Sequence, residues 1–160
     1  MMLALPGDDE AGAAQPGLAK GNTPQAGLFG DLLDRFTEIV GPAASEATFH
    51  YASLQEGMRL GSGHGPKELA AALARVDGVV GQRSRVLEDR AEAVRIAVAG
   101  SSLLASGNPV RQAVVRGLIE GMLRVVRGRP YTGRVVPPAA GATAAEVVIE
   151  FRAEAANAPS

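Results

Sequence analysis

The chain has 160 residues, which is enough for one domain with a substantial core and too few for two ordinary domains once the ends are discounted. Its 16 Lys and Arg residues balance 17 Asp and Glu residues, and the net charge of −1 gives no electrostatic reason to expect nucleic acid as a partner. The sequence has no cysteine, which excludes disulfides, thiolate metal sites and cysteine nucleophiles.

Targeting and membrane segments are not expected either. The first residues, MMLALPGDDE, have no basic region, and their apolar run is too short for a signal peptide. No later segment reaches the roughly 18 uninterrupted apolar residues of a membrane span. We therefore expect a soluble, cytoplasmic protein without membrane insertion.

The beginning of the chain predicts a tail followed by two helices. Residues 1–26 are rich in Gly, Ala, Pro and Asp and have no hydrophobic period, which is typical of a disordered tail. Over residues 28–40 the apolar residues fall on one helical face, and a Gly-Pro pair then stops the helix. A second helix is expected over residues 43–61, with apolar positions spaced by four, three and four.

A short helix and a hairpin are expected next. Residues 67–76 have helical spacing, and Gly78 and Gly81 should close that segment. Residues 91–100 alternate with a period of two, which predicts a half-buried strand. Residues 82–90 form a weaker strand, so that a turn over residues 88–92 completes a hairpin. The inward face of the second strand is Val94, Ile96 and Val98.

The clearest single element is a long helix over residues 109–127. Asn108 is a cap, Pro109 fits the first helical position, and Gly128 can take the left-handed turn after the end. One stripe is apolar and the opposite one is charged, so we expect a core face and a solvated face that carries salt bridges. The apolar stripe is Val110, Val114, Leu118, Met122 and Val125, and the charged one is Arg111, Arg116, Glu120, Arg124 and Arg127.

Two glycines interrupt this helix beside its apolar stripe. Gly117 and Gly121 are four residues apart, and each weakens a helix by roughly 1 kcal/mol relative to Ala. We expect a strand or a second helix to lie close against them, the alternative being glycines that are merely tolerated. Residues 101–107, which lead into the helix, are expected to be a strand end or a loop.

The end of the chain completes the predicted fold class. Residues 131–136 and 144–152 are two more strands joined by PPAAGAT, and residues 154–160 are a frayed end. Helices and single strands do not alternate, which excludes a doubly wound parallel sheet. We predict one α+β domain over residues 27–153, with an antiparallel four-stranded sheet of two hairpins covered by helices. The long helix connects the two hairpins and crosses the sheet.

The region from residue 94 to residue 152 resembles the vinyl-reductase-type (four-vinyl reductase) small-molecule-binding domain, which is related to haem nitric-oxide-binding and vesicle-trafficking folds. The resemblance is carried by VRIAVAGSS, a Pro-led helix with GLIEG, RGRPYTGRVV and VVIEF, and it extends upstream to SEATFHYASLQEGMRLG. Family members often carry cysteines before the long helix and in the last hairpin. This chain has none, so thiol and metal chemistry is not carried over.

The resemblance implies a pocket between helices and sheet for a small apolar molecule such as a hydrocarbon or a tetrapyrrole, often in a dimer. The side chains that we expect to line it are Phe36, Phe49, His50, Tyr51, Leu54, Met58 and Met122. His50 or Tyr51 would be the polar group that fixes the orientation of the ligand. No cofactor can be named from the sequence.

The residues themselves offer little for catalysis or metal binding. His50 and His64 are the only histidines. A helix histidine such as His50 is more often partly exposed than a ligand, and a histidine in a glycine-rich loop, such as His64, more often lies at a flexible tip. The serines are not framed by a G-x-S-x-G elbow. We therefore predict no catalytic and no metal site, and enzyme activity has no support from the residues.

Two functions from different classes remain. The first is a small-molecule-binding sensor or carrier domain without catalysis, whose partners are an apolar ligand and a second copy of the chain. The second is a structural or adaptor protein in which the same side chains fill a solid core and the helix surfaces bind partners. A pocket of at least about 300 Å³ among the predicted side chains would favour the first.

Overall fold

The structure is a computed structural model that describes residues 24–138 and 146–155. Two helices, α1 (Pro24–Val40) and α2 (Pro42–Gly61), precede a short 3₁₀ turn, η1 (Pro66–Glu68), and α3 (Leu69–Val80). The strands β1 (Arg83–Asp89) and β2 (Ala93–Ala99) follow, and then α4 (Ser102–Ala105) and α5 (Pro109–Arg127). The strands β3 (Tyr131–Val136) and β4 (Glu146–Ala153) complete the chain order.

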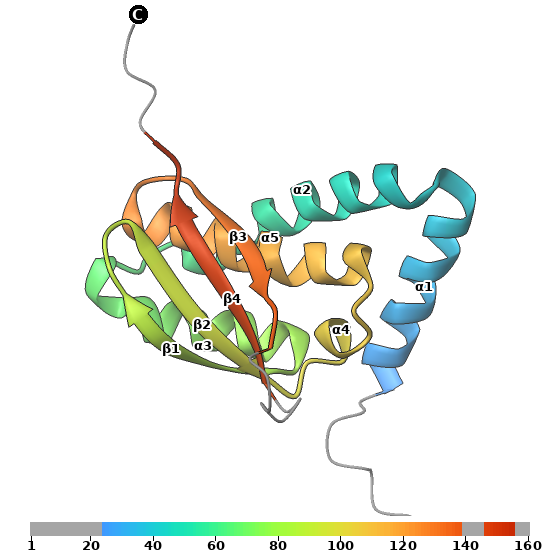
Figure 1. The fold of residues 1–160 in the computed structure, drawn as a ribbon, viewed down its shortest axis with the longest axis horizontal. Helices are drawn as coiled ribbons and strands as arrows, with labels where there is room; N and C mark the ends of the chain where they lie inside the picture. The colour runs from blue at the N-terminus through green and yellow to red at the C-terminus, as the bar shows by residue number, and fades with distance from the viewer. Residues whose placement is uncertain (1–23, 139–145, 156–160) are drawn as a thin grey trace, which may run out of the picture.

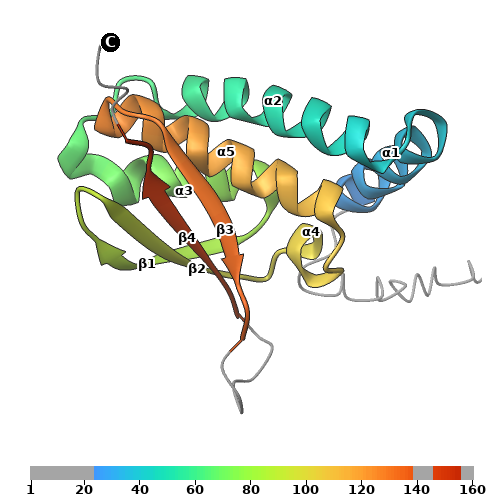
Figure 2. The same ribbon diagram turned by 45° about the horizontal axis from the view of Figure 1, so that its top comes forward.

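The four strands form one antiparallel sheet in the order β1-β2-β4-β3. The helices α3 and α5 pack on one face of the sheet, and α2 lies on α5 on the side away from the sheet (Figures 1 and 2). This confirms the predicted α+β class, with an antiparallel sheet covered by helices and a long helix between the hairpins. The helix α1 lies at one side of the molecule, where it joins the N-terminal end of α2 (Figure 1).

The core lies between the sheet and the helices α3 and α5. The predicted inward face of β2 is confirmed, because Val94, Ile96 and Val98 are all buried, and so are Ile149 and Phe151 on the paired strand β4. These side chains meet the buried apolar residues of α5, and burial of each such side chain contributes about 1.5–3 kcal/mol.

The predicted ends of α5 are confirmed. The side-chain oxygen of Asn108 accepts hydrogen bonds from the backbone N–H groups of Val110 (2.9 Å) and Arg111 (3.3 Å). Pro109 is the first helical residue, and Gly128 has φ 69° in the left-handed region. Sequence signals that act within one turn therefore located both ends of this helix.

Other predicted boundaries need correction. Of the two glycines expected to close the third helix, only Gly81 does so, because α3 continues through Gly78 to Val80 and ends at the left-handed Gly81. The segment expected to be a strand end or loop contains the short helix α4, where Ser101 accepts a hydrogen bond from the N–H of Leu104. The helix α1 begins at Pro24, before the predicted residue 28. Residues 1–23 of the predicted tail, residues 139–143 of the PPAAGAT loop and residues 156–160 lie outside the described residues.

Candidate functional site

Four glycines bring the helices α2 and α5 into backbone contact. A Cβ atom on Gly121 would lie 2.0 Å from the carbonyl oxygen of Leu54, and one on Gly117 would lie 2.6 Å from that of His50. On the other helix, a Cβ atom on Gly57 would lie 2.0 Å from the carbonyl oxygen of Leu118. Gly61 makes a similar approach to Met122. The expectation that a second helix lies against the α5 glycines is confirmed, and that helix is α2.

This close crossing leaves no room for a ligand between α2 and α5, so cavities occur on its two flanks. The first flank is a groove of about 560 Å³ between α2, α3 and α4, which we call the apolar groove. Its walls include Phe49, Val79, Val80, Leu103, Val114 and Leu118. Phe29 of α1 also lines it. Polar groups are few there, the main ones being Ser53, Glu56 and Ser102.

The second flank is a cavity of about 480 Å³ between α2, α5 and the start of β3, which we call the polar pocket. Its charged lining comes from both helices and from the end of β4. The acidic and basic side chains are Glu46, His50, Arg116, Glu120, Arg124 and Glu154. Ala47, Leu54 and Pro130 add apolar surface.

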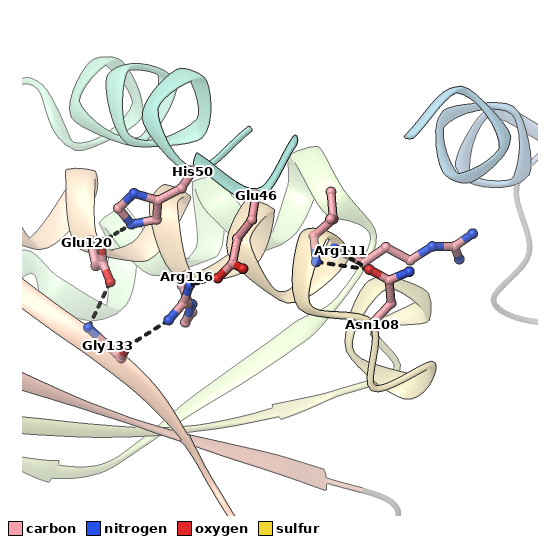
Figure 3. A network of polar contacts seen from close by, with 8 residues as sticks. Glu46, His50, Asn108, Arg111, Arg116, Glu120 and Gly133 are labelled. Carbon is pink, nitrogen blue, oxygen red and sulfur yellow. Dashed lines mark hydrogen bonds and ion pairs between the residues drawn. The ribbon is translucent and has the colours of Figure 1, made fainter. Parts of the chain in front are cut away.

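A buried carboxylate organises the polar pocket. Glu120 is only 4% exposed, and a buried carboxylate needs hydrogen-bond partners to offset the loss of water. One oxygen accepts the backbone N–H of Gly133 on β3 at 2.7 Å, and the other pairs with Nε2 of His50 on α2 (Figure 3). Glu120 therefore links α5 to a neighbouring helix and to an edge strand of the sheet.

Arg116, one turn before Glu120 on α5, holds the same strand. Its guanidinium donates to the carbonyl oxygen of Gly133 at 3.4 Å and to Glu46 of α2 at 3.3 Å (Figure 3). Since β3 is paired with β4 on only one side, Arg116 and Glu120 supply hydrogen-bond partners to the free edge of β3.

The structure corrects the charged face predicted for α5. Glu120 was expected to be solvated and is buried in the network just described. Arg111 pairs with Asp34 of α1 at 2.7 Å, and Arg127 pairs with Asp89 of β1. These arginines therefore join α5 to other elements. On the apolar stripe, Val126 is buried, whereas the predicted Val125 is only half-buried.

The predicted ligand-binding side chains do not gather around one cavity. Phe49 lines the apolar groove, and its ring packs edge-on against Phe36 with centroids 5.1 Å apart. His50 and Leu54 line the polar pocket on the other flank. Tyr51 is 66% exposed. Met122 is fully buried in the core, and Met58 is half-buried. Ligand binding by these residues stays a prediction.

Sequence reasoning missed the charged lining of the polar pocket apart from His50. The signal that could have found Glu120 is its place between Gly117 and Gly121. A residue directly beside a glycine contact face is close to the neighbouring helix, so a carboxylate there is expected to have a specific partner.

No group of three His, Cys, Asp or Glu side chains suited to a metal ion occurs within residues 24–138 and 146–155. Over the same ranges, no helix combines the length and apolar character needed to cross a bilayer.

Comparisons with known proteins establish similarity of fold. No family model matches the sequence, and no curated protein sequence matches it significantly. The structure is similar to the phenol-responsive sensory domain of the transcription activator PoxR, solved with phenol (TM-score 0.56, 16% identity, covering 79% of this chain and 74% of that one).

A second similar structure is trafficking protein particle complex subunit 3 from Naegleria fowleri, covalently bound to palmitic acid (TM-score 0.57, 16% identity, covering 82% of this chain and 94% of that one). The chain thus shares a fold with a small-molecule-binding domain and with a trafficking subunit. Membership of the vinyl-reductase-type family stays a prediction.

Proposed function

We propose that this chain is a small-molecule-binding sensor or carrier domain that holds an apolar ligand in the apolar groove. The observation that supports this most is the groove itself, with about 560 Å³ of space walled by Phe49, Val79, Leu103 and Leu118. Ligand pockets have this size range and combine apolar walls with a few polar groups. The buried Ser53 is the polar group that we assign to orienting the ligand.

The ligand that we propose is a hydrocarbon-like molecule, either an alkyl chain or a small aromatic compound. Proteins of this fold have been solved with phenol and with palmitic acid, which supports that range. A tetrapyrrole fits less well, because its ring nitrogens and carboxylates need more polar partners than Ser53, Glu56 and Ser102 supply. The sequence has no thiol for attaching an acyl group, so we propose a ligand that is held without a covalent bond.

We further propose that the domain works without catalysis, in the cytoplasm and as a homodimer. The two histidines do not line the apolar groove, and its Glu56 carboxylate is paired with Arg59 of the same helix, Nε to Oε2 2.8 Å. A nucleophile and base pair, which most hydrolytic mechanisms need, is therefore not part of the proposal. The vinyl-reductase-type resemblance adds ligand binding and dimer formation, and no reductase chemistry.

The test uses two alanines of α2 that lie on opposite flanks. Ala52 lines the apolar groove and Ala47 lines the polar pocket, and both are exposed. Binding of the neutral probe 1-N-phenylnaphthylamine is measured by its fluorescence. Ala52→Phe fills the groove and should raise the Kd at least about tenfold, whereas Ala47→Phe should leave it unchanged. Displacement by phenol and by palmitic acid then ranks the two ligand classes.

A second function is favoured by one observation on α1. Leu28, Leu32 and Ile39 lie on one helical face and are 62%, 55% and 82% exposed. Exposed apolar stripes of this kind mark protein contacts, which supports the adaptor function. Absence of probe binding in the wild-type protein, or equal binding by the Ala52→Phe variant, would reject the apolar-ligand proposal and leave the adaptor.

A further inference from the structure

The polar pocket has hydrogen-bonding capacity that the chain itself does not use. Side-chain acceptors without a partner would suit a cationic ligand, and side-chain donors without a partner would suit an anionic one. The pocket contains three carboxylates, Glu46, Glu120 and Glu154, and two guanidinium groups, Arg116 and Arg124. The partner of each group decides between the two ligand classes.

Each carboxylate already has a donor. Glu120 accepts from the N–H of Gly133 with one oxygen and pairs with His50 through the other. Glu46 is paired with Arg116 at 3.3 Å. Glu154 accepts the hydroxyl of Thr132 at 2.9 Å. A cationic ligand would therefore have to displace a partner of the buried Glu120, both of whose oxygens are engaged, and could otherwise reach only the second oxygens of Glu46 and Glu154.

The two guanidinium groups have fewer hydrogen-bond partners within the described residues than their donors could use. Arg124 is exposed at the pocket and has no hydrogen bond or ion pair with any residue in the ranges 24–138 and 146–155. The Nε atom of Arg116 is buried and has no partner among the same residues, and its two other contacts are long, at 3.3 and 3.4 Å. Arg124 thus brings a guanidinium group with free donors, and Arg116 adds a buried Nε–H without a partner, so the pocket has unused donors.

The two arginines of the polar pocket lie close together on α5. Arg116 and Arg124 stand one turn before and one turn after Glu120 on α5, so all three side chains face the same cavity. Opposite them, α2 contributes apolar surface from Ala47 and Leu54. The cavity thus has one wall that offers N–H donors and one that can cover a short apolar body.

We propose that the polar pocket is a second ligand site, distinct from the apolar groove, and that it takes a small organic carboxylate. Arg124 is the main contact for the carboxylate, and the guanidinium group of Arg116 is the second cationic group of the site. The planar guanidinium fork matches a carboxylate with two parallel hydrogen bonds, which lysine cannot reproduce. The apolar body of the ligand lies against Leu54 and Ala47. The proposal does not depend on occupation of the apolar groove.

The test measures binding of benzoate by isothermal titration calorimetry, with Arg124→Gln as the main variant. Arg124 is exposed and makes no ion pair within the described part of the chain, so the variant should fold, which a thermal melt verifies. Loss of a charge-assisted contact should raise the Kd for benzoate about tenfold or more. Arg75→Gln is the matched control, because Arg75 is an exposed arginine of α3 that has no ion pair among the same residues.

Further arms separate the possible sources of a signal. Ala47→Phe should weaken benzoate binding and Ala52→Phe should not, the reverse of the pattern expected for 1-N-phenylnaphthylamine. Benzamide, which has the same shape without the charge, should bind at least about tenfold more weakly than benzoate. Inorganic phosphate tests whether the site accepts any anion.

Several results would overturn the proposal. Benzoate binding that is unchanged in Arg124→Gln, or that is lost in Ala52→Phe and kept in Ala47→Phe, places the ligand elsewhere. Phosphate binding as tight as benzoate binding rejects the assignment to organic carboxylates. Absence of benzoate binding together with normal 1-N-phenylnaphthylamine binding rejects this site alone and leaves the proposed function intact.

Discussion

The two flanks of the α2–α5 crossing share the same helices and differ in nearly every other respect. The apolar groove is closed by α3 and α4, and its walls are aliphatic and aromatic. The polar pocket is closed by the edge strand β3, and its walls carry six acidic or basic side chains. The neighbours of each flank explain this difference: α3 and α4 present apolar side chains, whereas an edge strand presents unpaired backbone groups that require polar partners.

The comparison shows that the glycine contact joins α2 to α5 and also separates the apolar groove from the polar pocket. Helices with ordinary side chains at the contact lie 8–10 Å apart, because interdigitated side chains fill the space between them. Bare backbones at Gly57, Gly61, Gly117 and Gly121 remove that space, so each flank can have its own chemistry. The predictions below test this division, from the largest expected effect to the smallest.

The largest effect is expected from Gly121→Ala. The new Cβ would lie 2.0 Å from a backbone carbonyl oxygen, which no rotamer change can relieve, so the helices must separate. We expect the free energy of unfolding to fall by about 3 kcal/mol or more, measured by urea denaturation with circular dichroism.

Gly78→Ala is the matched control for this substitution. Gly78 is also a glycine inside a helix, but a Cβ there meets nothing within 4 Å. This variant should be more stable than wild type by about 0.5–1 kcal/mol, because Ala is the better helix former. Equal effects of the two substitutions would show that helix propensity alone determines the result and that the crossing is not close.

Glu120 gives the next largest effect and tests the polar flank alone. Glu120→Ala leaves the N–H of Gly133 buried without an acceptor, so we expect a loss of about 2–3 kcal/mol in the free energy of unfolding. Glu120→Gln keeps an acceptor for that N–H and should cost less than half as much. The Gly133 amide should lose its protection from hydrogen exchange in the Ala variant only.

The control for Glu120 is Glu38→Ala on the exposed side of α1, which should change the free energy of unfolding by no more than about 0.5 kcal/mol. A Glu120→Ala variant as stable as this control would mean that water replaces the carboxylate at Gly133 and that the link to β3 is not structural.

These effects also mark what the sequence could and could not predict. The ends of α5 and the inward face of β2 depend on residues within one turn or one alternation, and they were predicted correctly. The partner of Gly117 and Gly121 was expected only as a strand or a helix. Its identity depends on Gly57 and Gly61, which lie about 60 residues earlier in the chain. Two helices that each carry a pair of glycines four residues apart are expected to pack against each other, and this signal could have identified α2 as the partner of α5.

The candidate site was harder to predict for a related reason. Side chains that are close in sequence on α2, such as Phe49 and His50, point to opposite flanks because successive helical residues are about 100° apart. A list of aromatic and apolar residues from one helix therefore mixes the two cavities. Glu120 was misplaced because its partners, His50 and the Gly133 backbone, come from two other elements.

The smallest effect concerns Glu56, the carboxylate at the edge of the apolar groove. Its pKa lies below the ordinary value of 4.5, mainly because Arg59, three residues later on α2, donates hydrogen bonds to the ionised form. Both side chains are exposed, so water and salt screen the pair, and its contribution to stability should be small.

The sign of the pH effect follows from the lowered pKa of Glu56. The pair stabilises the folded state at every pH above the unfolded pKa, and that contribution is lost as the pH falls through the lower folded pKa. In Arg59→Gln the pKa of Glu56, measured by NMR titration of its side-chain carboxyl carbon, should rise toward 4.5. Arg124→Gln, on the opposite flank, should leave that titration unchanged. If the pKa of Glu56 shifted in both variants, the charge of Arg124 would act across the α2–α5 contact. The two flanks would then not be electrostatically separate.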